Sequence, residues 1–82
     1  MQRQPVTDAQ RDRIEASLPF VEALARRVAS SMPNSIEIDD LVQDGVLGLM
    51  DAAHRFDEGR GIKFETFAER RVRGAMIDAL RR

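Results

Sequence analysis

Apolar residues in this chain recur every three or four positions, which is the spacing of one face of an α-helix. Phe20, Leu24 and Val28 follow this spacing, and Val21 lies beside them. No segment alternates apolar and polar residues as a half-buried β-strand would. We therefore predict an all-α fold, a compact bundle of three or four helices joined by short loops, in one small domain of 82 residues.

Capping residues and helix breakers divide the chain into helices. Thr7 or Asp8 caps the first helix, and Pro19 falls in the first turn of the second. Asp39 is a capping residue for the third helix, and two glycines give residues 57–61 the composition of a turn. The predicted helices cover roughly residues 8–17, 19–31, 40–56 and 64–81.

The third predicted helix carries apolar residues on two opposite faces. At about 100° per residue, one stripe is formed by Val42, Gly45, Leu49, Ala53 and Phe56. Leu47 and Met50 fall on the other side, among Asp40, Gln43, Asp44 and Asp51. This second pair is either an incidental exposure of apolar side chains or the centre of an interface with a polar rim. Such an interface suits a partner that presents arginines to the carboxylates.

The last predicted helix lies in the basic part of the chain. Residues 1–54 hold five Arg against nine Asp and Glu, a charge of −4, whereas residues 55–82 hold eight Lys and Arg against five acidic residues, a charge of +3. Phe67 lies about 60° from the core stripe of this helix, so an unpaired base can stack on its ring while the arginines contact phosphates. In the alternative interpretation, the phenylalanines anchor the core and the arginines form a solvated face. The predicted core stripe contains Phe64, Ala68, Val72, Ala75, Met76 and Ala79.

Several classes of function lack the residues that they require. The chain has one histidine, no cysteine and no phosphate-binding glycine loop, so we expect neither an enzyme nor a cofactor. The acidic residues of the third helix lack the alternating oxygen ligands of a calcium loop, and capping and solvation explain them. His54 is interpreted as a surface residue on the same face. The absence of a long apolar run and of a signal-peptide core indicates a cytoplasmic protein.

Four motifs in fixed order resemble region 2 of the bacterial sigma-70 family of sigma factors. They are DDLVQDGVLGLM at 39–50, FD at 56–57, GIKFETFA at 61–68 and RGAMID at 73–78. The last motif resembles the flagellar and sporulation branch more than the housekeeping branch. The likeness covers roughly residues 17–82, and we expect residues 1–16 to form an N-terminal helical extension. The sequence stops before the aromatic-proline segment that follows in this branch, so we expect a fragment of a longer protein.

The resemblance implies a helical domain of the subunit that gives RNA polymerase its promoter specificity in transcription initiation. By motif, the third helix would bind the coiled coil of the polymerase β′ subunit, and the last helix would bind the non-template strand of the promoter −10 element. An anti-sigma factor is a further candidate partner. The implied polymerase-binding residues are Asp40, Gln43, Asp44, Val46, Leu47 and Met50. The implied DNA-binding residues are Lys63, Thr66, Phe67, Arg70, Arg71 and Arg73.

Some positions depart from the housekeeping pattern. Phe67 stands where housekeeping members commonly have a tyrosine that stacks on a flipped adenine, and a phenyl ring keeps the stacking face. Arg70 and Arg71 occupy the place of a tryptophan pair, which implies less stacking and more phosphate contact. Val46 replaces a residue that is often polar. Two other classes of function remain open, a helical protein–protein adaptor that does not act on DNA and a small hydrolase that uses the carboxylates.

Overall fold

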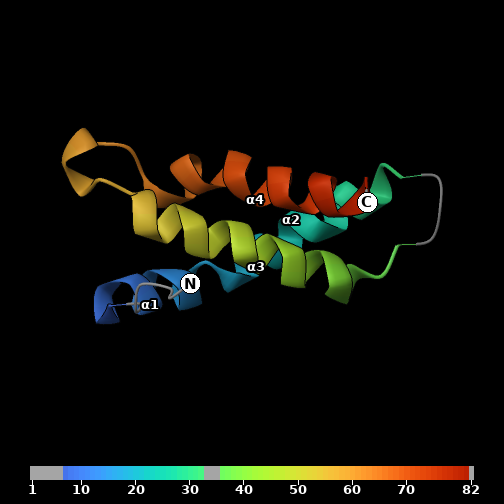
Figure 1. Ribbon diagram of the computed structural model, residues 1–82, viewed down its shortest axis with the longest axis horizontal. Coiled ribbons are helices and arrows are strands. Elements are labelled where there is room, and N and C mark those ends of the chain that lie inside the picture. Colours follow the sequence, from blue (N-terminus) through green and yellow to red (C-terminus); the bar gives the residue numbers. More distant parts are fainter. Residues whose placement is uncertain (1–6, 33–35, 82) are drawn as a thin grey trace, which may run out of the picture.

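The fold is described by a computed structural model that covers residues 7–32 and 36–81. No strand occurs in these two segments, and the prediction of an all-α bundle is confirmed. Helix α3 lies beside α4 and runs antiparallel to it, α2 packs across both, and α1 lies along the end of α3 that leads into the loop (Figure 1). The elements are α1 (Asp8–Ala16), α2 (Leu18–Ser30), α3 (Ile38–Arg55), the 3₁₀-helix η1 (Glu58–Arg60) and α4 (Phe64–Leu80). No helix of the described segments is long and apolar enough to cross a membrane.

The predicted start signals are confirmed for α1 and α2. The Thr7 side chain accepts a hydrogen bond from the Gln10 backbone at 3.1 Å, and the Gln10 side chain accepts one from the Thr7 backbone at 2.9 Å, which completes a capping box. Pro19 lies in the first turn of α2, as predicted. The cap predicted at Asp39 is wrong, because α3 begins at Ile38 and places Asp39 inside the first turn. There its carboxylate faces the positive end of the helix dipole without capping a backbone group. Residues 34 and 35 of the predicted connector lie outside the described segments.

Most of the buried residues are the predicted apolar residues of α2, α3 and α4. In α3, Gly45, Leu49 and Ala53 of the predicted stripe are buried, and its two ends are partly buried. Leu41 and Ala52 are also buried, although the predicted stripe omits them. The buried arc of α3 is wider than one stripe because α2 and α4 both cover this helix. The buried apolar residues are Val21, Leu24, Ala25, Val28, Leu41, Leu49, Ala52, Ala53, Ala68, Val72 and Met76.

Helices α3 and α4 meet backbone to backbone at Gly48. A β-carbon at this position would lie 2.6 Å from the carbonyl oxygen of Arg71 and 3.0 Å from the α-carbon of Val72. Because a β-carbon essentially never comes closer than 3.0 Å to such a neighbour, the observed separation of the two helices requires glycine here. At Gly61 the requirement is conformational, because its φ of 74° lies in the left-handed region and turns the chain from η1 into α4.

Helix α1 is attached to the rest of the domain through Arg13. Its guanidinium lies 5.0 Å from the ring centroid of Phe56 and 5.5 Å from that of Phe64, and it pairs with Glu58 at 2.5 Å. The Arg13 side chain is only 21% exposed. One side chain of α1 therefore touches the end of α3, the loop and the start of α4.

Replacing this arginine should measurably destabilise the domain. We expect Arg13→Ala to lower the free energy of unfolding by about 1–2 kcal/mol, because a cation–π contact and an ion pair are lost together. Urea unfolding followed by circular dichroism measures the change. Arg11→Ala is the matched control, since Arg11 pairs only with exposed Asp8 within α1 and should change stability by less than about 0.5 kcal/mol. Equal effects of the two substitutions would show that Arg13 does not anchor α1.

Candidate functional site

The acidic face of α3 presents an apolar side chain to solvent. Leu47 is 54% exposed, which makes it the most exposed large hydrophobic residue in the part of the chain that the structure describes. Asp40 and Gln43 beside it are exposed, and Asp44 and Met50 are half-buried. The exposed position predicted for Leu47 is therefore confirmed. Val46 instead packs against the core, so it contributes less accessible surface to this face than its neighbours.

Three of these acidic-face residues also border a groove at the N-terminal end of α3. Asp40, Gln43 and Asp44 line it together with Leu41 and the C-terminal end of α4, at Leu80. Leu47 and Met50 lie further along the helix and do not line the groove. The six residues implied in polymerase binding thus form an elongated surface along α3 rather than a single pocket.

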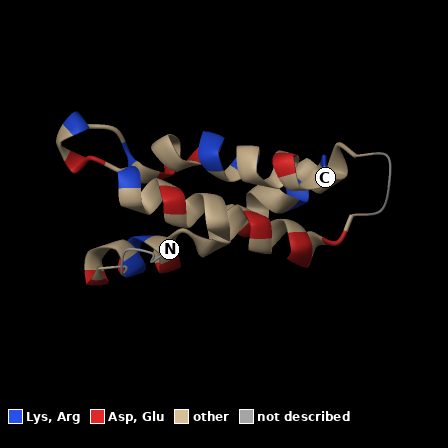
Figure 2. Ribbon diagram, in the orientation of Figure 1, with Lys and Arg blue, Asp and Glu red and all other residues tan. Residues whose placement is uncertain are grey.

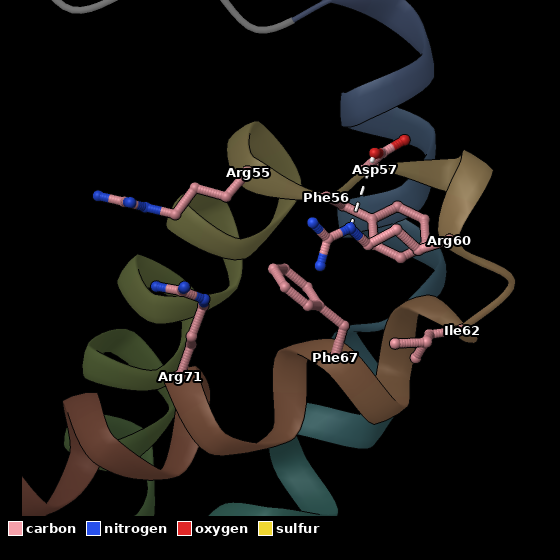
Figure 3. A pocket seen from close by; sticks show the side chains of 7 residues that line it. All are labelled: Arg55, Phe56, Asp57, Arg60, Ile62, Phe67 and Arg71. Atoms are coloured by element: carbon pink, nitrogen blue, oxygen red, sulfur yellow. Dashed lines mark ion pairs between the residues drawn. The ribbon is translucent and has the colours of Figure 1, made fainter.

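A second candidate site is a basic and aromatic pocket of about 400 Å³ between α3 and α4 (Figure 3). Phe67 and Arg71 of α4, two of the residues implied in DNA binding, line it. The remaining lining residues were not predicted as site residues, because they come from the end of α3 and from the loop that the sequence shows only as a turn. They are Arg55, Phe56, Asp57, Arg60 and Ile62.

Aromatic packing fixes the position of the Phe67 ring. The Phe56 and Phe67 ring centroids are 5.5 Å apart with a tilt of 50°, and Phe56 meets Phe64 edge to face at 5.2 Å. Both distances fall in the range of favourable aromatic pairs. Phe64 and Phe67 are both half-buried and both pack against the core, as the alternative interpretation proposed, but of the two only Phe67 also lines the pocket.

The pocket is electropositive, although each of its guanidinium groups has an acidic neighbour. Arg60 lies 3.9 Å from Asp57, and Figure 3 shows Phe67 between Arg60 and Arg71. Asp51, which does not line the pocket, accepts a hydrogen bond from Arg55 at 2.9 Å and another from Arg71 at 3.0 Å. The arrangement can therefore hold a planar ring and an anion together, which is what a nucleotide presents.

The other residues implied in DNA binding lie outside the pocket. Lys63, Thr66 and Arg70 are exposed, and Arg73 pairs with Glu69 at 3.2 Å. At about 100° per residue, Thr66 and Arg73 lie roughly 100–120° around α4 from Phe67, on a different side of the helix. The six residues therefore do not form one compact patch. Figure 2 shows acidic residues spaced along α3 and a basic residue at its end, whereas the loop and α4 carry residues of both signs.

The arrangement of the acidic side chains and of His54 does not favour the hydrolase interpretation. Within the described segments, no group of three or more His, Asp or Glu side chains is placed to hold a metal ion. The ring nitrogen Nδ1 of His54 lies 2.8 Å from the Met50 carbonyl oxygen of its own helix, on an exposed face. Asp51 is committed to two arginines.

Because of these arginine contacts, we expect the free energy of unfolding to decrease at acid pH. The hydrogen bond from Arg55 holds the pKa of the Asp51 carboxyl below its ordinary value, partial burial opposes this, and the charges of Arg55 and Arg71 lower it further. A carboxyl whose pKa is lower in the folded state stabilises the fold above its unfolded pKa, about 4, and loses that contribution as the pH falls through the folded pKa. Asp51→Asn should therefore lower the free energy of unfolding near neutral pH by at most about 1 kcal/mol.

The acid dependence distinguishes this ion-pair effect from a packing effect. The free energies of unfolding of the original chain and of Asp51→Asn, measured with urea, should differ at about pH 7, and the difference should shrink as the pH falls below about 4. A difference that is constant over this range would mean that the Asp51 carboxylate does not act through its charge.

Comparison with known protein families adds independent information on the whole domain. The family model of Sigma-70 region 2 matches residues 13–82, which include both candidate surfaces. The chain belongs to this family. The match to Sigma-70 region 2 begins inside α1 and covers the end of that helix as well as α2, α3 and α4.

Relatives of this sigma region 2 domain are sigma factors of the flagellar type, so the branch indicated by RGAMID is confirmed. The chain is 39% identical to the RNA polymerase sigma factor FliA of Pseudomonas aeruginosa over 75 residues, or 92% of the chain and 30% of the relative. It is 42% identical to the RNA polymerase sigma-D factor of Bacillus subtilis over 71 residues, or 87% of the chain and 28% of the relative. FliA of Escherichia coli K12 is 45% identical over 64 residues, or 78% of the chain and 27% of the relative. The chain spans less than a third of the length of these relatives.

Proposed function

We propose that this domain directs transcription initiation as part of a sigma factor, most closely of the flagellar type. In this proposal the acidic face of α3 binds the β′ coiled coil of RNA polymerase, and the pocket with the basic side of α4 binds the non-template strand of the promoter −10 element. The role is non-catalytic and is carried out in the cytoplasm, where the polymerase acts. The observation that carries the proposal is the match to Sigma-70 region 2 over nearly the whole described domain.

The exposure of Leu47 supports polymerase binding by α3. Protein interfaces commonly place apolar anchors inside a polar rim, and Leu47 lies among Asp40, Gln43 and Asp44 on one helical face. A partner with basic residues around an apolar patch would pair with the carboxylates and cover Leu47.

The pocket supports the binding of unpaired DNA by α4. A base stacked on Phe67 would have Arg60 and Arg71 within reach of its phosphates, and a cavity of about 400 Å³ is large enough for one nucleobase. In a duplex the bases are stacked on one another, so this pocket favours a strand that has already opened.

Two binding measurements with the same chain test the proposal. We expect binding to the isolated β′ coiled coil and weaker, salt-sensitive binding to single-stranded −10 DNA, because only a few cationic side chains contact the strand. Binding to β′ without any binding to single-stranded DNA would instead support the protein–protein adaptor. Failure to bind either partner would contradict the proposed function.

A further inference from the structure

One carboxylate of α3 serves two of the three arginines that line the pocket. The Oδ1 atom of Asp51 accepts from Nε of Arg55 at 2.9 Å, and its Oδ2 atom accepts from the Arg71 guanidinium at 3.0 Å. The Asp51 side chain is 44% exposed and that of Arg71 is 38% exposed. The Asp51–Arg71 ion pair therefore lies at a surface that solvent and ligands can reach.

This pair determines what lies against the Phe67 ring. The guanidinium carbon of Arg71 is 5.3 Å from the Phe67 centroid, within the range of about 6 Å for a cation–π contact. Phe56 packs on the same ring at a centroid distance of 5.5 Å. A base that stacks on Phe67 from the side of Arg71 needs the space that this guanidinium covers.

A nucleotide carries the group that can move Arg71. Phosphate and carboxylate oxygens are both anionic acceptors that fit a guanidinium, so a phosphodiester can replace the Asp51 carboxylate as the partner of Arg71. The exchange replaces one exposed ion pair by another, and its net cost is small. Arg55 would keep the Asp51 carboxylate as its own partner, so Asp51 would not be left unpaired.

We propose that Asp51 is a positioning residue for base capture. Its carboxylate holds Arg71 beside the Phe67 ring in the free domain. A nucleotide phosphate then replaces the carboxylate as the partner of Arg71, which frees the ring face for the base. This inference rests on the proposed capture of an unpaired base in the pocket. It assigns Asp51 to the DNA site, although the sequence places it on the acidic face of α3. The two candidate surfaces meet at this ion pair.

The test is the affinity of the 82-residue chain for a short fluorescent oligodeoxyadenylate at fixed salt. Asp51→Asn should bind this probe about three-fold more tightly than the original chain, because the ion pair no longer competes with the phosphate. Asp8→Asn is the matched control, since it removes one negative charge and breaks an exposed ion pair with Arg11 in α1. The affinity gain should be absent when Asp51→Asn is made in the Arg71→Ala background, a dependence that a general charge effect would not show.

The results distinguish the positioning role of Asp51 from the proposed capture of a base at Phe67. An affinity of Asp51→Asn equal to or below that of Asp8→Asn overturns the role of Asp51, and so does a gain that persists without Arg71. Phe67→Ala should weaken probe binding about ten-fold through lost stacking, and circular dichroism verifies that each variant is folded. If Phe67→Ala binds as the original chain does, base capture itself is wrong. If only Phe67→Ala has an effect, base capture stands and the role of Asp51 falls.

Discussion

Gly48→Ala should destabilise the domain by about 2–3 kcal/mol, although alanine is the better helix former. The added β-carbon would lie 2.6 Å from the carbonyl oxygen of Arg71, and a backbone atom of α4 cannot move away unless the two helices separate. That separation would loosen the buried contacts of Leu49 and Val72 on either side. The loss is a large part of the roughly 4–12 kcal/mol expected for a domain of this length.

Gly74 provides a control on the same pair of helices. A β-carbon at Gly74 would have no atom within 4 Å, so Gly74→Ala should raise the free energy of unfolding by up to about 1 kcal/mol through helix propensity alone. Urea unfolding followed by circular dichroism measures both variants. The account of the α3–α4 contact fails if Gly48→Ala is as stable as Gly74→Ala.

The combined substitution Leu47→Ala and Gln43→Ala should weaken binding to the β′ coiled coil by roughly thirty-fold, or about 2 kcal/mol. Leu47 is 54% exposed and Gln43 is exposed, so the free domain loses little when both are shortened. In the proposed complex, an apolar anchor and an amide hydrogen-bonding group disappear from the centre of the polar rim. Isothermal titration calorimetry of each variant against the isolated coiled coil measures the affinity.

A second exposed apolar residue serves as the control for this experiment. Ile62 is 47% exposed but lies at the pocket, away from Leu47, so Ile62→Ala should leave β′ binding unchanged. Unchanged binding after the double substitution would rule out the acidic face of α3 as the docking surface. A similar loss for Ile62→Ala would mean that apolar exposure, rather than the α3 face, drives the association.

Local signals predicted the helices because each depends on residues close together in sequence. A cap at Thr7, one of two candidates, Pro19 in the first turn of α2 and the outward position of Leu47 all follow from residues close together in sequence. The burial of Leu41 and Ala52 did not follow, since it depends on α2 and α4 covering α3 from two sides. Periodicity within one helix does not contain that information.

The pocket was only partly predictable, for a related reason. Phe67 and Arg71 could be proposed from α4 and from the family resemblance, but Arg55 reaches the pocket from the end of α3 and Arg60 from the 3₁₀-helix η1. The pairing of Asp51 with Arg71 joins residues twenty positions apart on two helices. Such contacts depend on the packing angle and separation of α3 and α4, which the sequence pattern does not specify.

The contact at Gly48 also limits how this domain can transmit motion. Leu47 faces solvent, and the next residue along α3 touches the backbone of Arg71, which lies one helical turn from Phe67. The close approach at Gly48 thus joins the helix that carries Leu47 directly to the helix that carries Phe67. In the proposed complex, the short backbone contact at Gly48 would therefore restrict how far a protein bound at Leu47 could move relative to a base bound at Phe67. In that complex, this domain would set the spacing between polymerase and promoter. Any variation in that spacing would have to come from movement outside the domain.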